Sequence, residues 1–153
     1  MSDPTSDRLD LRSLVDRYAV GADRRDAATV AALFEEDGRL LVHRNGEGSP
    51  ATSEVIGRTA LEAAIASLVR WTSTTHLVGQ QVVEVDGDEA TGVTYCLAHH
   101  LGDRGDPSRN RVDSIRYLDR YRRHPGGWRF VERRLCFDWT EIRTVVARST
   151  VQP

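Results

Sequence analysis

A single change of hydrophobic period near Thr74 constrains the fold of this chain more than any other feature. Before Thr74, apolar residues recur three and four positions apart, as on one face of an amphipathic helix. After it come long segments rich in β-branched and aromatic residues, separated by short turns. Helices confined to the first half and antiparallel strands to the second favour an α+β domain.

The first half predicts three helices and one short strand. Apolar residues between Leu11 and Ala22 form the stripe of the first helix. Asp26 is a suitable N-cap for a second helix, whose apolar stripe continues to Phe34. We expect a strand over residues 39–43 and a polar loop over 44–55. A capping box at Thr59 predicts a third helix that reaches about residue 69.

The second half predicts four long strands, over residues 76–85, 90–101, 111–123 and 128–139. The mixed acidic and basic run at 119–123 is typical of the solvated face of a strand. A strongly curved sheet over the helices would leave a pocket closed at one end. The length suits one domain, which we place at residues 9–140, between a disordered tail at 1–8 and an extension at 141–153.

All 21 basic residues are arginine, and the absence of lysine excludes several chemistries. No Schiff base, pyridoxal-phosphate anchor or phosphate-loop lysine can form. The net charge of −2 gives no nucleic-acid footprint, and no apolar run approaches the roughly 18 residues of a membrane span. The first residues lack a secretory pattern, so we expect a cytoplasmic protein in which Cys96 and Cys136 are free thiols.

A few side chains could transfer protons near neutral pH. Asp23 falls near the end of the first helix, where a carboxylate opposes the helix dipole; the alternative is an exposed Asp23 paired to Arg24 or Arg25. Tyr18 lies on the apolar stripe and is a candidate either for the core or for a site. His76 begins the first long strand.

The histidines at the end of the second long strand must point to opposite faces. His100 shares a face with Cys96 and Ala98, which suits a cavity wall, whereas an isolated histidine more often lies at the surface. No metal is expected, because the histidines lack ligand spacing. An imidazole oriented by a carboxylate can act as a general base, and a tyrosine hydroxyl can bind a leaving or enolising oxygen.

Several short segments carry a family resemblance in the same order along the chain. They are Tyr-Ala-Val-Gly-Ala-Asp at 18–23, Phe-Glu-Glu-Asp-Gly at 34–38, Gly-Arg-Thr-Ala at 57–60, Thr-His-Leu-Val at 75–78, Val-Asp-Gly-Asp-Glu-Ala at 85–90, Tyr-Leu-Asp-Arg-Tyr at 117–121 and Gly-Trp-Arg-Phe at 127–130. Over residues 9–140 the chain resembles SnoaL-like proteins of the nuclear transport factor 2-like superfamily. The resemblance implies a cone-shaped α+β barrel, in which a strongly curved, mixed but mainly antiparallel sheet wraps around three N-terminal helices and a deep apolar pocket.

The most similar branch includes scytalone dehydratase, hexachlorocyclohexane dehydrochlorinase and bile-acid dehydratase, which eliminate without a cofactor. By this resemblance, Asp23 and His76 match the catalytic aspartate and histidine. Tyr18 matches a catalytic tyrosine of the bile-acid enzyme, and His100 matches the second histidine of scytalone dehydratase. Two tyrosines of scytalone dehydratase are replaced, by Ala22 and near Val42, which argues against a scytalone substrate.

The resemblance implies a cofactor-independent, dehydratase-like lyase that acts on an apolar cyclic small molecule. Substrate-binding residues are expected at Val42, Cys96, Ala98 and Tyr117. Two alternatives remain: an isomerase or polyketide-cyclase-type enzyme using the same pocket, and a non-catalytic subunit like the small subunit of ring-hydroxylating dioxygenases. We expect no nucleic-acid or membrane partner, and a homodimer or homotrimer formed through a sheet face near Tyr117, Tyr121, Phe130 and Trp139.

Overall fold

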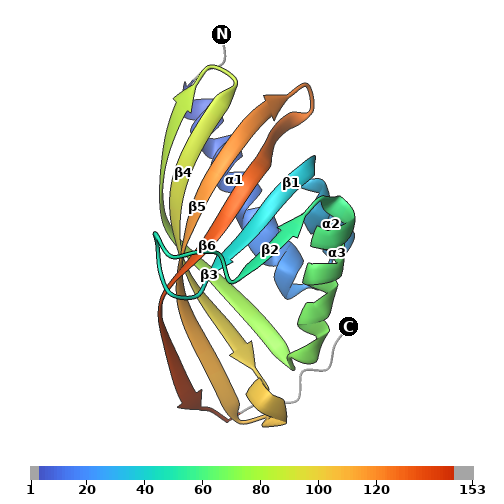
Figure 1. Cartoon of the computed structure of the whole chain (residues 1–153), viewed down its shortest axis with the longest axis vertical. Helices are drawn as coiled ribbons and strands as arrows, with labels where there is room; N and C mark the ends of the chain where they lie inside the picture. The colour runs from blue at the N-terminus through green and yellow to red at the C-terminus, as the bar shows by residue number, and fades with distance from the viewer. Residues whose placement is uncertain (1–3, 147–153) are drawn as a thin grey trace.

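The computed structural model describes residues 4–146. Within this range the helices are α1 (Pro4–Asp23), α2 (Ala27–Ala32) and α3 (Arg58–Ala66), with short 3-10 turns η1 (Ser67–Arg70) and η2 (Asp103–Gly105). The strands are β1 (Phe34–His43), β2 (Ser53–Ile56), β3 (Ser73–Asp86), β4 (Glu89–Leu101), β5 (Arg109–His124) and β6 (Gly127–Thr144). Figure 1 shows the helices gathered on one side of a long, curved sheet.

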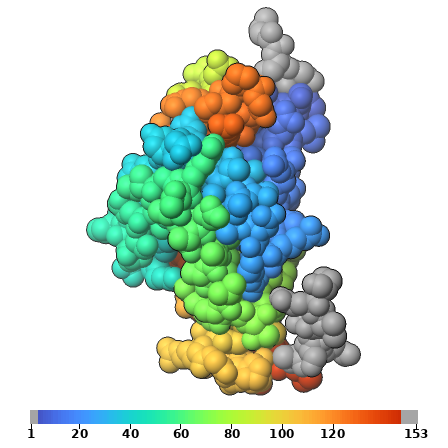
Figure 2. Space-filling view, turned by 90° about the vertical axis from the view of Figure 1, so that its right-hand side faces the viewer, coloured from blue at the N-terminus to red at the C-terminus, as the bar shows by residue number. Residues whose placement is uncertain are grey.

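The sheet is mixed and open, with strand order β2-β1-β6-β5-β4-β3 in the described range. Its one parallel pair is β1 with β6, and the other neighbours are antiparallel. Helix α1 packs along the inner face beside β3, and α2 and α3 cover β1 (Figures 1 and 2). The predicted α+β class and curved mixed sheet are confirmed. The sheet is not closed into a barrel, since β2 and β3 are its edges.

Three local predictions in the first half are wrong. Helix α2 ends at Ala32, and Phe34 opens β1 instead of extending the helical stripe. The expected polar loop over residues 44–55 ends in β2, which pairs with β1. Gly57, at φ 84°, precedes α3 without a side-chain cap, so the capping box at Thr59 does not form. A positive φ of this kind is open to glycine at low cost. Helix α3 therefore starts at Arg58, two residues earlier than the Thr59 capping box predicted.

The domain extends further at both ends than predicted. Residues 4–8 belong to α1 instead of to a tail, because the Asp7 side chain is buried and accepts hydrogen bonds from Arg123 and Trp128. Residues 141–144 belong to β6 instead of to an extension. The remaining parts of the predicted tail and extension, residues 1–3 and 147–153, lie outside the described residues.

A buried ion pair lies at the centre of the sheet. Asp119 on β5 and Arg133 on β6 are register partners. Both side chains are fully buried and joined by two hydrogen bonds of 2.8 Å, from Nε to Oδ1 and from Nη2 to Oδ2. The Tyr121 hydroxyl donates to the same carboxylate at 2.8 Å. The prediction of a solvated strand face at 119–123 is therefore wrong for Asp119 and Tyr121, which alternate inward while Arg120 points out.

Aromatic rings enclose the guanidinium of Arg133. The rings of Tyr18, Tyr117 and Phe130 have their centroids 4.2, 4.0 and 4.3 Å from it. Burial alone lowers the pKa of Arg133, but Asp119 outweighs that effect and the pKa is raised above its ordinary value. The arginine therefore stays charged inside the core, where its planar face is covered by ring faces.

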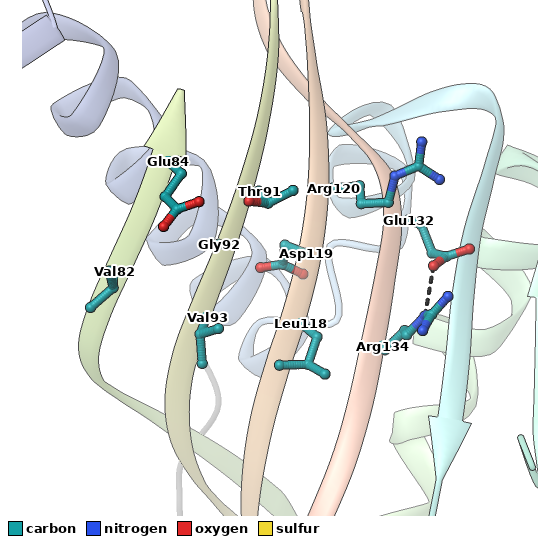
Figure 3. Close-up of a pocket in the computed structure, with 10 residues that line it drawn as sticks. All are labelled: Val82, Glu84, Thr91, Gly92, Val93, Leu118, Asp119, Arg120, Glu132 and Arg134. Carbon is teal, nitrogen blue, oxygen red and sulfur yellow. Dashed lines mark hydrogen bonds and ion pairs between the residues drawn. The ribbon is translucent and has the colours of Figure 1, made fainter. Parts of the chain in front are cut away.

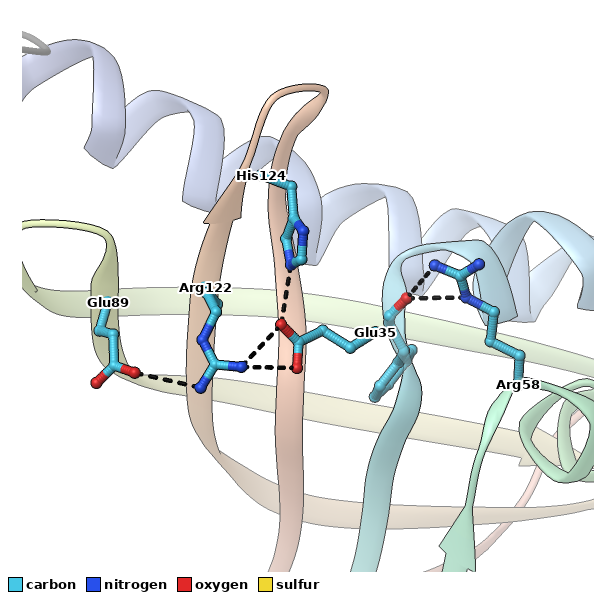
Figure 4. Close-up of polar contacts among 6 residues, drawn as sticks. Glu35, Arg58, Glu89, Arg122 and His124 are labelled. Atoms are coloured by element: carbon cyan, nitrogen blue, oxygen red, sulfur yellow. Dashed lines mark hydrogen bonds and ion pairs between the residues drawn. The ribbon is translucent and has the colours of Figure 1, made fainter.

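A second polar cluster fixes the first strand to the far end of the sheet (Figure 4). The Glu35 carboxylate on β1 accepts from Arg122 at 3.2 Å and lies 2.9 Å from His124 Nε2, both at the end of β5. Arg58, at the start of α3, donates to the Phe34 carbonyl at 2.8 and 3.0 Å. One end of β1 is thus tied to both the sheet and α3.

The aromatic residues expected on an oligomer face are mostly in the core. Tyr117, Tyr121 and Phe130 are 1%, 1% and 0% exposed and point toward the helices. Trp139 is 49% exposed. Three of the four side chains offered for self-association therefore have no surface to contribute, because the strand alternation directs them to the inner face.

The buried pair yields a stability prediction. We expect Asp119→Asn to lower the free energy of unfolding by about 3–5 kcal/mol, because it leaves the Arg133 charge buried without a counter-ion. Urea unfolding followed by circular dichroism measures the change. The control is Asp88→Asn, which removes an exposed partner of Arg123 and should change stability little. Equal effects of the two substitutions would contradict a structural role for the buried pair.

Candidate functional site

The carboxylate of Asp23 joins the end of α1 to the edge strand β3. It accepts hydrogen bonds from the Thr74 hydroxyl at 2.9 Å and from the His76 backbone N–H at 2.9 Å. Arg25 does not pair with this carboxylate; its guanidinium donates to the Asp23 carbonyl at 2.7 Å and to the Thr74 hydroxyl at 2.8 Å. The bonds from β3 compensate for a carboxylate at the negative end of a helix dipole.

The imidazole of His76 contacts the same carboxylate. His76 Nδ1 lies 2.6 Å from Asp23 Oδ1, and both side chains are largely buried. Burial raises the pKa of Asp23, but hydrogen bonds from His76 and Thr74 outweigh it, and the pKa is lowered overall. Since an ionised carboxylate only accepts hydrogen bonds, Nδ1 carries the proton and Nε2 is left as the basic nitrogen.

The strand register places His100 beside His76. Thr74 of β3 pairs with His100 of β4, which pairs with Arg111 of β5. The two imidazole rings lie 5.9 Å apart and nearly perpendicular, and the Trp71 ring is 4.9 Å from His100. His100 shares its inward face with Cys96 and Ala98, as the strand alternation predicted. Burial, followed by repulsion from His76, lowers the pKa of His100 to about 4, so this imidazole is neutral at pH 7.

These residues surround a cavity of about 370 Å³ between the inner face of the sheet, α3 and the β1–β2 loop. Figure 2 shows the teal loop after β1 beside the green chain of α3 and η1, and both segments contribute lining residues. Tyr18, Val42, His76, His100 and Tyr117, all named above as candidate site residues, line it. Their catalytic or binding roles stay predictions. Its other walls are Ala22, Leu40, Arg44, Thr52, Ser53, Val55, Ala64, Ile65, Ser67, Leu68, Arg70, Trp71, Arg111, Asp113, Ile115, Leu135 and Phe137.

Three predicted residues lie behind the cavity wall. Cys96 and Ala98 are 3% and 0% exposed on the correct face, but they are not among the lining residues. Their role in substrate binding therefore stays a prediction. Asp23 also lies behind the wall, with the His76 imidazole between its carboxylate and the cavity.

The phenol of Tyr18 keeps its proton at the cavity wall. The ring is 4% exposed and forms part of the cavity wall. Burial raises the pKa of Tyr18 above its ordinary value. The phenol therefore remains protonated at neutral pH, so it can hydrogen-bond to a substrate oxygen but cannot act as a base.

Sequence reasoning missed the charged groups in the cavity. Arg111 and Asp113 lie on β5, where Arg111 Nε donates to Asp113 at 3.0 Å. Their alternation with Ile115 and Tyr117 was a usable signal, since all four share one face. Arg44 and Arg70 come from a loop and a 3-10 turn, whose side-chain directions no periodicity predicts.

A second hollow, of about 400 Å³, lies over β3–β6 (Figure 3). Val82, Val93 and Leu118 supply its apolar part, and Arg120 and Arg134 are among its charged residues. Its lining includes no histidine, cysteine or tyrosine. The histidines named as candidate bases, His76 and His100, line the first cavity instead.

Two further properties hold for the described residues. Residues 4–146 contain no group of three or more histidine, cysteine, aspartate or glutamate side chains placed to hold a metal ion. In the same range no helix is both long and apolar enough to cross a membrane.

The curved sheet, covering helices and enclosed cavity define an α+β domain of the nuclear transport factor 2-like type. The SnoaL-like domain model matches residues 3–134, and the chain therefore belongs to that family. No protein of curated function matches the chain in sequence.

Solved structures extend the comparison. A nuclear transport factor 2-like protein with a cystatin-like fold from Novosphingobium aromaticivorans is 29% identical, with a TM-score of 0.67 over 90% of this chain and 92% of that chain. A candidate scytalone dehydratase from the same species is 20% identical, with a TM-score of 0.77 over 97% and 95%. A hexachlorocyclohexane dehydrochlorinase from Novosphingobium barchaimii is 19% identical, with a TM-score of 0.75 over 97% and 97%. The last two share the fold.

The environment of His100 yields a pH prediction. Because its pKa falls from 6.5 to about 4 on folding, protonation favours the unfolded chain. His100 should therefore reduce stability progressively as the pH falls from 6.5 toward 4, by roughly 2–4 kcal/mol in total. Above pH 6.5 it should add no pH dependence.

Urea unfolding at several pH values, compared between the wild type and His100→Gln, isolates this contribution. The variant should lose less stability than the wild type between pH 6.5 and 4. Imidazole nitrogen chemical shifts give a second measurement, in which His100 should remain neutral at pH 5.5. A His100 ring protonated at that pH would contradict its burial.

Proposed function

We propose that this protein is a cofactor-independent small-molecule lyase, dehydratase-like in its chemistry, in which His76 is the base and Asp23 orients it. The observation that carries the proposal is the 2.6 Å contact between His76 Nδ1 and Asp23 Oδ1, with the imidazole in the cavity wall and the carboxylate behind it. This arrangement leaves Nε2 as the group able to accept a proton from a bound substrate. Family membership and the shared fold of the two eliminating enzymes support the same class of reaction.

The reaction we propose begins with a carbon acid next to an activating group. His76 Nε2 takes the proton, the C–H electron pair becomes the new carbon–carbon π bond, and the C–O bond of the neighbouring hydroxyl breaks toward oxygen. Asp23 stabilises the imidazolium that forms. The imidazolium then returns its proton to the departing oxygen, which leaves as water, so that the enzyme ends unchanged.

The leaving oxygen would be held by neutral donors. His100 is uncharged near neutral pH and lies beside His76, so it can donate a hydrogen bond without a full positive charge. The Tyr18 hydroxyl lines the same cavity and remains protonated. Apolar walls at Leu40 and Ile115 suit a ring-containing substrate and keep water from competing for the base.

Removing either member of the dyad tests the proposal. We expect His76→Gln and Asp23→Asn each to lower kcat by about 10²–10⁴-fold, because the base is lost or is no longer held in the correct tautomer. The assay screens cyclic β-hydroxy carbonyl compounds for an ultraviolet signal from the conjugated alkene and for a mass loss of one water.

The matched control is His99→Gln, which changes a histidine on the opposite face of β4 and should leave kcat unchanged. Circular dichroism establishes that each variant folds. Full turnover in a folded His76→Gln variant would overturn the role of His76. Failure of the wild type to convert any compound would favour a non-catalytic subunit.

A further inference from the structure

The mouth of the cavity carries an excess of positive charge. Three guanidinium groups line the cavity, from Arg44, Arg70 and Arg111, against the single carboxylate of Asp113. Arg44 and Arg70 are exposed and Arg111 is half-buried, so we place these groups at the mouth. Within residues 4–146 no carboxylate lies within ion-pair distance of Arg44 or Arg70. This excess contrasts with the net charge of −2 for the whole chain, so it is a local property of the mouth.

Aromatic residues hold two of these guanidinium groups at the cavity. Arg44 lies 4.7 Å from the Phe137 ring centroid, and Arg70 lies 5.3 Å from that of Trp71. Both rings are themselves part of the cavity wall. Stacking uses the face of a guanidinium and leaves its N–H groups, which lie at the edge, free to bind a ligand. These arginines are thus held against the cavity with their donors unused.

Arg111 is fixed in a different way. Its Nε donates to both Asp113 oxygens, at 3.1 and 3.0 Å. Asp113 is itself held by the Thr140 hydroxyl at 2.6 Å. In the wall of the same cavity, the buried indole Nε1 of Trp71 has no hydrogen-bond partner, a cost that a ligand oxygen would remove. Burial, followed by repulsion from Arg111, lowers the pKa of Arg44, which a bound anion would relieve.

We propose that the substrate carries a carboxylate, held at the cavity mouth by Arg44, Arg70 and Arg111 with help from the Trp71 indole. Arginine pairs with carboxylates through two parallel hydrogen bonds, so this set matches a carboxylate in shape as well as in charge. His100, the register partner of Arg111, lies 5.9 Å from His76. A carboxylate at the mouth therefore directs the body of the molecule past His100 toward His76.

This inference deepens the proposed function and rests on it for the fate of the bound molecule, but its own test is a binding measurement. The probes are three aromatic carboxylates, benzoate, cinnamate and 2-naphthoate, each compared with its primary amide by isothermal titration calorimetry. We expect at least one carboxylate to bind about 10–100-fold more tightly than its amide, since hydrogen bonds to charged groups are the stronger ones. The preference should weaken as salt is added.

Arg44→Gln and Arg70→Gln should each reduce the carboxylate preference by about 3–10-fold while leaving amide affinity unchanged, because each removes one cation from the mouth. Both positions are exposed, so folding should not suffer. Arg111→Gln is a secondary variant, because it removes the ion-pair partner of the buried Asp113 carboxylate. Arg120→Gln removes an equal charge from the other hollow (Figure 3) and should leave both affinities intact.

The possible failures can be told apart. His76→Gln should keep the carboxylate preference, since it changes the base and not the mouth. A carboxylate preference in a protein whose dyad variants retain turnover would overturn the proposed function alone. Three results would overturn the carboxylate site. They are equal binding of carboxylates and amides, no binding of any probe, and a carboxylate preference that persists in both Arg44→Gln and Arg70→Gln.

Discussion

Much of this structure depends on keeping one arginine charged in the core. Arg133 is fully buried and cannot be hydrated, so it requires the opposite charge of Asp119 and a cover of aromatic rings. Two of those rings, Tyr18 and Tyr117, also form walls of the cavity. The same packing that accommodates the ion pair therefore also forms part of the cavity wall.

The residues of the site are brought together by strand register and not by long loops. Thr74, His100 and Arg111 occupy successive strands at paired positions, and His76 lies two residues along β3 on the same inward face. A one-residue slip of β3 would turn His76 to solvent. Asp23 opposes such a slip, because its carboxylate binds both the backbone and the side chain of His76. The Asp23–His76 contact on which the proposed reaction depends thus also fixes α1 against the edge strand β3.

The parts of this arrangement that the sequence predicted are those determined by local periodicity. The two-residue period identified the four long strands and placed His100 on the inward face, and the helical stripe placed Tyr18 inside. The Asp119–Arg133 pair was missed because each residue, read alone on a strand, is typical of a solvated position, and its partner lies on another strand. The boundary at Phe34 was missed because a buried apolar residue suits either a helix or a strand.

The cavity combines two electrostatic environments that sequence reasoning treated as one apolar pocket. Near His76 the Asp23 carboxylate contacts the imidazole and His100 is neutral, which suits transfer of a proton. At the mouth, three guanidinium groups face one carboxylate, which favours an anion. A molecule with an apolar ring and a charged end satisfies both environments in only one orientation. The charge at the mouth would then select the orientation. The uncharged end of the molecule would lie near His76, where the proposed reaction takes place.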